Sequence, residues 1–174
     1  MFAFLIAEGF IHTRSRYRYF FTLLGFAVIS EIPWYLLNGA DGTHNVMFTL
    51  ALGVATLMVL ENLLQRSMVL GFLWTLGMAG LASWLGVDYE WRGIIVIDIF
   101  YLYNILLNID ENYRYSSLIF CYFIMSYYGI IGTIFAIYII YLYNTFRGFI
   151  NMSTLKYIFY LFYPLHLYIL LFFT

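Results

Sequence analysis

Long apolar runs separated by short polar segments are the feature that most restricts the fold of this chain. A helix of roughly 20 apolar residues crosses the hydrocarbon core of a bilayer. Runs close to that length occupy residues 19–38, 44–64, 67–86, 93–109 and 155–174. The polar segments are too short to form an extramembrane domain. The sequence therefore predicts an all-α, polytopic transmembrane helix bundle that forms a single integral membrane domain over residues 1–174.

The composition agrees with an integral membrane protein and excludes several other classes. Hydrophobic residues make up 64% of the chain and charged residues 10%, whereas about 25% of an ordinary soluble domain is charged. The net charge of −1 supplies no basic excess for the phosphates of a nucleic acid. One cysteine cannot form a disulfide within the chain, and the three histidines lack zinc-like spacing. We therefore expect the lipid bilayer as a partner, and neither a nucleic acid nor a metal.

The first residues form an apolar run that is too short to cross a bilayer. Residues 1–11 would rise about 16 Å as a helix, roughly half of the hydrocarbon core. We therefore expect a half-helix at the start, and a chain that begins in mid-membrane suggests truncation at its N-terminus.

Residues 116–144 are long for one crossing and are interrupted by the sequence SYYG at 126–129. They form either one tilted span or a short helical hairpin, giving about six to eight membrane helices. In a hairpin, Arg147 and Lys156 lie on the side that carries Arg14, Arg16, Arg18, Arg66 and Arg114, and only Arg92 lies opposite. The positive-inside rule favours this arrangement, although residues 116–127 alone are too short to span. We expect the basic loops to be cytoplasmic.

The segment AEGFIHTRSRYRY at residues 7–19 gathers charges at the end of an apolar run. Glu8, His12 and Arg16 would share one face if the helix continued, and Arg14 and Arg18 would form a second i, i+4 pair. The arginines could simply anchor a membrane helix on the cytoplasmic side. Alternatively, Glu8 fixes the tautomer of His12 and raises its basicity, as a general base requires.

Other ionisable residues interrupt the apolar runs, and such residues are costly enough in a membrane to be functional candidates. Glu31 lies beside Pro33, where a helix could bend or end. Asp98 lies well inside its run, and His166 follows Pro164, where a kink could turn it inward. The segment NGADGTH at 38–44 lacks the acids of a calcium loop and is interpreted as a turn. Nucleophile-elbow, phosphate-loop and dinucleotide motifs are absent from the sequence.

Five blocks of the sequence stand out: FAFLIAEGFIHTRSRYRY, AVISEIPWYLL, NVMFTLALGVATLMVLE, DYEWRGIIVIDIFYLY and LKYIFYLFYPLHLYILL. In their order and spacing these blocks resemble the TraX family of multi-pass membrane proteins, and the resemblance covers nearly the whole chain. The family is named after a conjugal-transfer protein implicated in N-terminal acetylation of pilin and resembles membrane acyltransferases. The resemblance implies a protein of the bacterial inner (cytoplasmic) membrane.

The resemblance also singles out individual residues of this chain. These are Glu8, His12, Arg14, Glu31, Pro33, Asn45, Asp88, Tyr89, Tyr163, Pro164 and His166. Family members usually begin with a further helix that carries an Asp-His pair. The resemblance therefore implies that this chain starts after that helix.

The resemblance implies transfer of an acetyl group from cytoplasmic acetyl-CoA to a pilin-like peptide amine or a glycan hydroxyl. Arg14, Arg16 and Arg18 would bind the phosphates of the donor. His12, oriented by Glu8, would accept the proton of the acceptor, and His166 could stabilise the oxyanion.

Two other functions fit the same sequence. Asp98, Glu31 and His166 could line the path of a proton-coupled transporter for small solutes. The chain could also be a non-catalytic membrane subunit. An oligomer could supply spans that one chain lacks.

Overall fold

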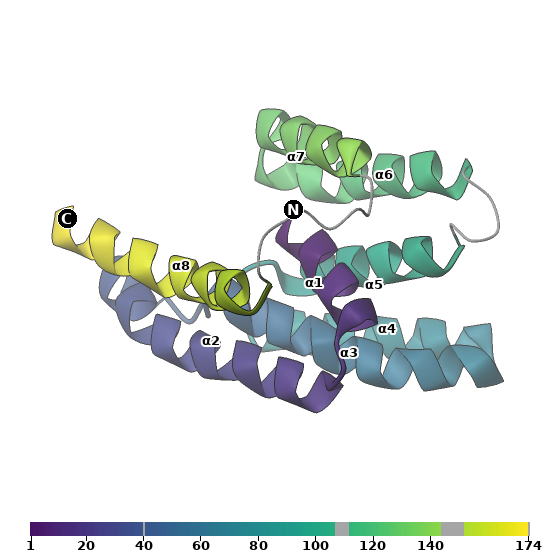
Figure 1. The fold of residues 1–174 in the computed structure, drawn as a ribbon, viewed down its shortest axis with the longest axis horizontal. Coiled ribbons are helices and arrows are strands. Elements are labelled where there is room, and N and C mark those ends of the chain that lie inside the picture. The colour runs from purple at the N-terminus through teal and green to yellow at the C-terminus, as the bar shows by residue number, and fades with distance from the viewer. Residues whose placement is uncertain (40, 107–111, 144–151, 174) are drawn as a thin grey trace.

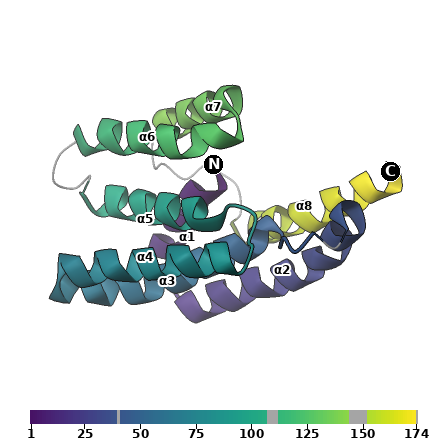
Figure 2. The same ribbon diagram turned by 180° about the vertical axis from the view of Figure 1, so that it is seen from behind.

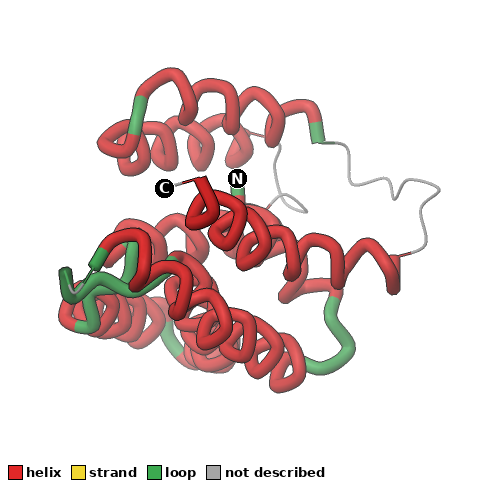
Figure 3. Tube along the Cα trace, turned by 90° about the vertical axis from the view of Figure 1, so that its left-hand side faces the viewer, coloured by secondary structure: helices red, strands yellow, loops and turns green. Residues whose placement is uncertain are grey.

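The computed structural model describes residues 1–39, 41–106, 112–143 and 152–173, with the side chains of 106, 112–114 and 152–159 outside the description. Within these residues the chain forms eight α-helices (Figure 3). The helices are α1 (Phe2–His12), α2 (Arg16–Asn38), α3 (Val46–Arg66), α4 (Met68–Trp84), α5 (Glu90–Leu106), α6 (Asn112–Met125), α7 (Ile130–Leu142) and α8 (Met152–Phe173). The all-α prediction is therefore confirmed.

The five long apolar runs correspond to α2, α3, α4, α5 and α8. Polar side chains mark two of the helix starts. The Ser15 side chain accepts a hydrogen bond from the Arg18 backbone N–H at the start of α2, and Asn45 accepts one from Met47 at the start of α3. Pro33 does not end α2, which continues to Asn38. Glu31 therefore lies within a helix.

The centre of the molecule is formed by α1, α3 and α5. Figures 1 and 2 show α3, α4 and α5 side by side, with α1 crossing α3 and α5 at a steep angle. Fully buried residues such as Phe10, Val54, Leu57 and Ile97 pack in this region. Gly53 on α3 faces the Ile97 side chain on α5, and its missing side chain allows these helices to approach closely.

The remaining helices flank this centre on two sides. On one side α2 packs against both α3 and α8, and the C-terminal end of α8 extends away from the molecule (Figure 1). On the other side α6 packs against α5, and α7 lies beside α6. The 3-10 turn η1 (Ser126–Tyr128) and Gly129, with a φ of 135°, separate α6 from α7. The structure thus confirms a hairpin instead of one long span, although Asn144 lies outside the described residues.

Two helices of the described chain, α2 and α3, are long and apolar enough to cross a membrane. Shorter apolar helices are formed by α1, α4, α7 and residues 160–173 of α8. Many large apolar side chains are exposed on the outer surface, including Ile131 at 86% and Phe123 at 71%. An apolar surface of this kind is typical of proteins that contact lipid or another apolar partner.

Candidate functional site

The predicted residues Glu8 and His12 lie together on the last turn of α1. His12 Nδ1 is 3.0 Å from the backbone carbonyl oxygen of Glu8 and 3.5 Å from its Oε2. Because a carbonyl can only accept, Nδ1 carries the hydrogen, and Nε2 retains the lone pair that a general base needs. The Glu8 side chain is almost buried and the His12 side chain is half exposed. The structure therefore places Glu8 beside His12, as their spacing on one helix predicts.

Arg16 is placed differently from the prediction. The helix ends at His12, and Arg16 begins α2 after the turn. Its guanidinium binds the Glu61 carboxylate with both terminal nitrogens, with 2.7 Å between Nη2 and Oε1. It also lies 4.7 Å from the centre of the Phe10 ring. The expectation that Glu8, His12 and Arg16 share one helix face is therefore wrong, and Arg16 instead joins α2 to α3.

The expected i, i+4 pair of Arg14 and Arg18 is also absent, because Arg14 precedes the Ser15 cap and lies in the turn. Both side chains are exposed at the end of the molecule where α1 ends, α2 begins and α3 ends. Arg66 is exposed at the end of α3. Among the described side chains, none of these three arginines has an ion-pair partner. We call this region the arginine end; it leaves three cations available for an anionic ligand.

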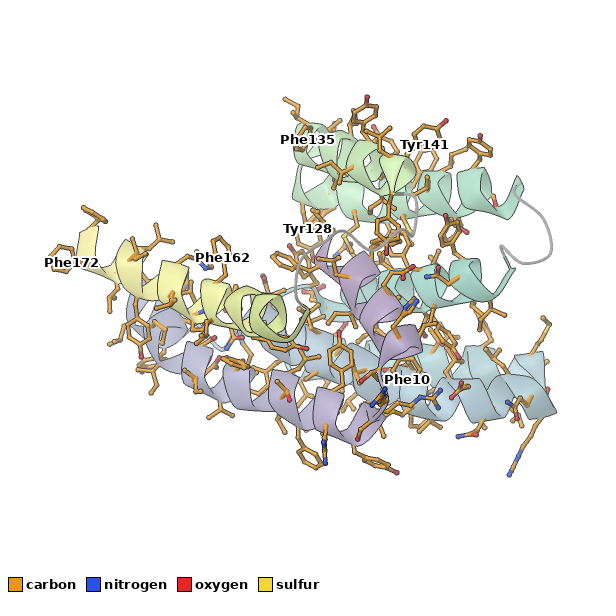
Figure 4. All side chains as sticks on the ribbon, in the orientation of Figure 1. Phe10, Tyr128, Phe135, Tyr141, Phe162 and Phe172 are labelled. Carbon is orange, nitrogen blue, oxygen red and sulfur yellow. The ribbon has the colours of Figure 1, made fainter. Side chains whose placement is uncertain are left out.

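His166 lies apart from His12. Its ring stacks on Phe162 at a centroid distance of 5.6 Å and contacts Tyr163 edge-on at 5.1 Å. Figure 4 shows Phe162 on the α8 side of the molecule and Phe10 near the end of α1. His166 Nδ1 is buried and has no hydrogen-bond partner in the described part of the chain. The structure therefore does not bring His166 to the pair formed by Glu8 and His12.

A second Glu–His pair lies at the opposite end of α3 and was missed by sequence analysis. His44 Nδ1 is 2.5 Å from Glu31 Oε1, and the other carboxylate oxygen accepts the Asn45 side-chain amide at 2.6 Å. Asn45 is fully buried and also donates to the Ala27 carbonyl oxygen at 2.9 Å. The carboxylate is thus held in place, with one oxygen directed at the imidazole.

The backbone of His44 is fixed by the turn between α4 and α5. Its N–H donates to the Gly86 carbonyl oxygen, and its carbonyl oxygen accepts the Asp88 N–H, both at 2.9 Å. We call this region the opposite end: here α2 ends, α3 begins and α4 is joined to α5. Five of the residues singled out by the family resemblance meet here: Glu31, Asn45, Asp88, Tyr89 and Tyr163 of α8, which contacts the Val46 backbone. That resemblance was the one signal that could have located this site.

Asp98 is confirmed as a deeply buried acid. It is 3% exposed on α5, and Thr75 of α4 donates a hydrogen bond to its Oδ2 at 2.5 Å. Oδ1 has no hydrogen-bond partner in the described residues. A cavity of about 230 Å³ lies between α1, α3, α5, α6 and α7, and its lining includes Thr49, Tyr89 and Cys121. Neither His12 nor His44 lines that cavity.

Asp88 lies in the turn that holds His44, and its burial predicts that the stability of the protein depends on pH. Burial raises the pKa of the Asp88 carboxyl above its ordinary value. The folded state therefore holds this proton more tightly than the unfolded state, and the resulting stability is lost as the pH rises through the raised pKa. We expect Asp88→Asn to raise the melting temperature at pH 7 and to leave it unchanged below about pH 4. Thermal unfolding of both proteins between these pH values checks this, and a variant that melts at or below the wild type at pH 7 contradicts it.

The family described as "TraX protein" matches residues 1–174. The chain is also 33% identical over 90 residues to the "Probable fimbrial assembly protein FimC, serogroup H1" of Dichelobacter nodosus. That match covers 45% of this chain and 36% of the relative, so the chain spans little more than a third of that protein's length. No solved structure matches.

Proposed function

Because this chain belongs to the TraX family, we propose that it is a membrane-embedded acyltransferase that uses acetyl-CoA. The acceptor is a peptide amine of the pilin type or a glycan hydroxyl. The observation that carries the proposal is the oriented His12 imidazole at the same end of the bundle as Arg14 and Arg18, which have no ion-pair partner among the described side chains. The name of the relative, a fimbrial assembly protein, supports an acceptor on a surface fibre.

The proposal places all of the helices in the membrane, with α2 and α3 as the full-length spans. Apolar side chains such as Phe123 and Ile131 would then face lipid. Among the described side chains, the arginine end carries Arg14, Arg16, Arg18 and Arg66, and the opposite end carries Arg92. By the positive-inside rule the arginine end faces the cytoplasm, where acetyl-CoA is available.

At the arginine end, each residue has a distinct role in the proposed reaction. Arg14 and Arg18 bind the phosphates of the donor through charge-assisted hydrogen bonds. As the acceptor nitrogen or oxygen attacks the acyl carbon, its proton passes to His12 Nε2. The carbon–sulfur bond then breaks, and the imidazolium returns the proton to the leaving thiolate. Glu8 positions the imidazole, and Arg16 holds α2 on α3 through Glu61.

Replacing His12 tests this role. We expect His12→Gln to lower the rate of acetyl transfer from labelled acetyl-CoA about 100-fold or more, because a positioned general base contributes at least that much. Tyr17→Phe is a suitable control, because Tyr17 is exposed at the same end and takes no part in the proposed chemistry. Full activity of the His12 variant would remove His12 from the mechanism.

Proton-coupled transport is a second candidate, favoured by Asp98. A carboxyl group that is 3% exposed, with one oxygen lacking a partner among the described residues, is characteristic of a proton-binding site in a membrane protein. In this case, vesicles containing the protein would take up protons under a pH gradient, and Asp98→Asn would abolish the uptake. An acyltransferase without transport activity would show neither effect.

A further inference from the structure

We infer that a lipid site lies between the α6–α7 hairpin and the centre of the bundle, and that it holds an acyl chain of an ethanolamine phospholipid. The site consists of the cavity of about 230 Å³ and the charged residues at its η1 end. The inference goes beyond acyl transfer, since neither His12 nor His44 lines the cavity. It rests only on the proposed placement of the helices in a membrane.

Small side chains at the start of α7 leave this space open. The helix α6 packs directly on α5, whereas α7 packs mainly on α6. The side of α7 that lines the cavity carries Gly129, Gly132, Thr133 and Ala136, which do not reach the central helices as larger apolar residues would. A Cβ added at Gly132 meets no atom within 4 Å. A gap of this kind forgoes dispersion contacts unless another molecule fills it.

The lining of the cavity favours hydrocarbon over water. Its apolar side chains include Leu50, Val96, Ile97, Phe100, Met125 and Ile137. Both threonine hydroxyls in the lining already take part in hydrogen bonds, because Thr49 accepts the Tyr89 N–H and Thr133 donates to the Gly129 carbonyl oxygen. Apolar cavities stay free of water, and one of about 150 Å³ is known to bind benzene. This larger cavity therefore suits a segment of an acyl chain.

A positive and a negative charge lie at the η1 end of the cavity. The hydroxyl of Tyr128, a residue of the lining, contacts the Arg92 guanidinium and lies near Glu90. The Arg92 guanidinium also lies 4.2 Å from the centre of the Tyr127 ring, and its Nη1 is 3.4 Å from the Glu90 carboxylate. An exposed ion pair of this length is weak, so both groups can bind a ligand.

The backbone of Glu90 is unusual. Glu90 begins α5 with a φ of 45°, and it is the one non-glycine residue of the described chain with a positive φ. Such a conformation is strained for an L-residue, and strained residues are concentrated at ligand-binding sites. The Glu90 side chain is 49% exposed. Burial therefore does not explain why an acid occupies this position, whereas a ligand at the mouth of the cavity does.

An ethanolamine headgroup is complementary to this pair of charges. Its phosphate would bind the Arg92 guanidinium, and its ammonium group would bind the Glu90 carboxylate. The rings of Trp91 and Tyr127 beside Arg92 are placed as interfacial aromatic residues are. The described acids of the opposite end are Glu31, Asp41, Asp88 and Glu90. A headgroup with negative charge alone is therefore disfavoured here, and a zwitterionic one is preferred.

Lipid retention tests the inference without any acyl transfer. The full chain is purified in detergent, mixed with phosphatidylethanolamine or with phosphatidylglycerol of the same acyl chains, and analysed by native mass spectrometry. We expect each chain to retain one phosphatidylethanolamine, with an affinity about fivefold above that for phosphatidylglycerol, because one matched charge contributes up to about that factor. Equal affinities for the two lipids, or no retained lipid, would overturn the inference.

Ala136→Phe tests the cavity itself. Ala136 lines the cavity, and a ring at this position takes the space of several methylene groups. We therefore expect the affinity for phosphatidylethanolamine to fall about tenfold or more. Ile131→Phe is the matched control, because Ile131 lies on the same helix, is 86% exposed and does not line the cavity. An Ala136→Phe protein that binds the lipid as the wild type does would contradict the inference.

Glu90→Gln tests the headgroup. It should remove the preference for phosphatidylethanolamine while one lipid is still retained, an effect that misfolding would not produce. Asp41→Asn should keep the preference, because the Asp41 carboxylate is at the same end but bonds to Thr43. A preference that survives Glu90→Gln would overturn the assignment. A wild-type protein that retains the lipid but transfers no acetyl group would contradict the proposed function alone, and transfer without a retained lipid would contradict this inference alone.

Discussion

Asn45→Ala is expected to lower the free energy of unfolding by about 3 kcal/mol. The Asn45 side chain accepts the Met47 N–H as the cap of α3, and loss of a cap typically costs about 1 kcal/mol. Its amide also donates to the Ala27 carbonyl and to the Glu31 carboxylate. Because Asn45 is fully buried, these acceptors would lose a partner that water cannot readily replace, at a cost of roughly 1–3 kcal/mol. Denaturant unfolding in detergent micelles measures the effect.

Asn38→Ala is the matched control for that measurement. Asn38 is also an asparagine at a helix end, but its side chain is exposed and donates to the Trp34 carbonyl oxygen at 3.2 Å. We expect this change to alter the stability by less than about 0.5 kcal/mol. Equal effects of the two substitutions would show that the buried amide does not hold α2 against the start of α3.

Gly86→Ala is also expected to lower the free energy of unfolding by about 3 kcal/mol, because the backbone at this position does not accommodate a side chain. Gly86 has a φ of 65°, a conformation that costs an L-residue roughly 1–2 kcal/mol. An added Cβ would also lie 2.7 Å from the Gly42 carbonyl oxygen, which belongs to the backbone and cannot rotate away. The turn would have to move, and with it the hydrogen bond between the His44 N–H and the Gly86 carbonyl oxygen.

Gly80→Ala should instead raise the free energy of unfolding. Gly80 lies within α4, and a Cβ there meets no atom within 4 Å. Replacing an unhindered helical glycine by alanine typically stabilises a protein by about 0.4–1 kcal/mol. Comparison of the two melting temperatures therefore isolates the strain at Gly86. If Gly86→Ala were as stable as Gly80→Ala, the close contact between the turns at residues 41–44 and 85–88 would be contradicted.

The helices could be predicted from the sequence because each long apolar run is bounded by polar residues. The interruption at 126–129 and the distribution of arginines together indicated the hairpin of α6 and α7. Glu8 and His12 could be paired because they lie one helical turn apart. These features depend on local sequence or on helix periodicity.

The contacts that were missed join residues distant in sequence. Arg16 binds Glu61 across 45 positions, and this contact depends on how α2 packs on α3. His44 was assigned to a simple turn, yet the packing of that turn against residues 86–88 brings its ring to Glu31. A helical pattern continued past His12 could not reveal that Thr13 and Arg14 form a turn. Tertiary packing, which no local pattern specifies, decides each of these positions.

The two ends of the bundle differ in charge, and the proposed reaction uses the cationic end. Among the described side chains, Arg14, Arg18 and Arg66 of the arginine end have no ion-pair partner, whereas the side chains of the opposite end are mainly acidic around His44.

Acetyl transfer by the wild-type protein in lipid vesicles is the most direct test of this account. Labelled acetyl-CoA is supplied on one side, together with a peptide that has a free amino terminus, and the peptide is analysed by mass spectrometry. We predict that the label appears on the amino terminus and that its appearance depends on His12. If these vesicles took up protons and the supplied peptide remained unlabelled, the acyltransferase account would be contradicted and transport through Asp98 would be favoured.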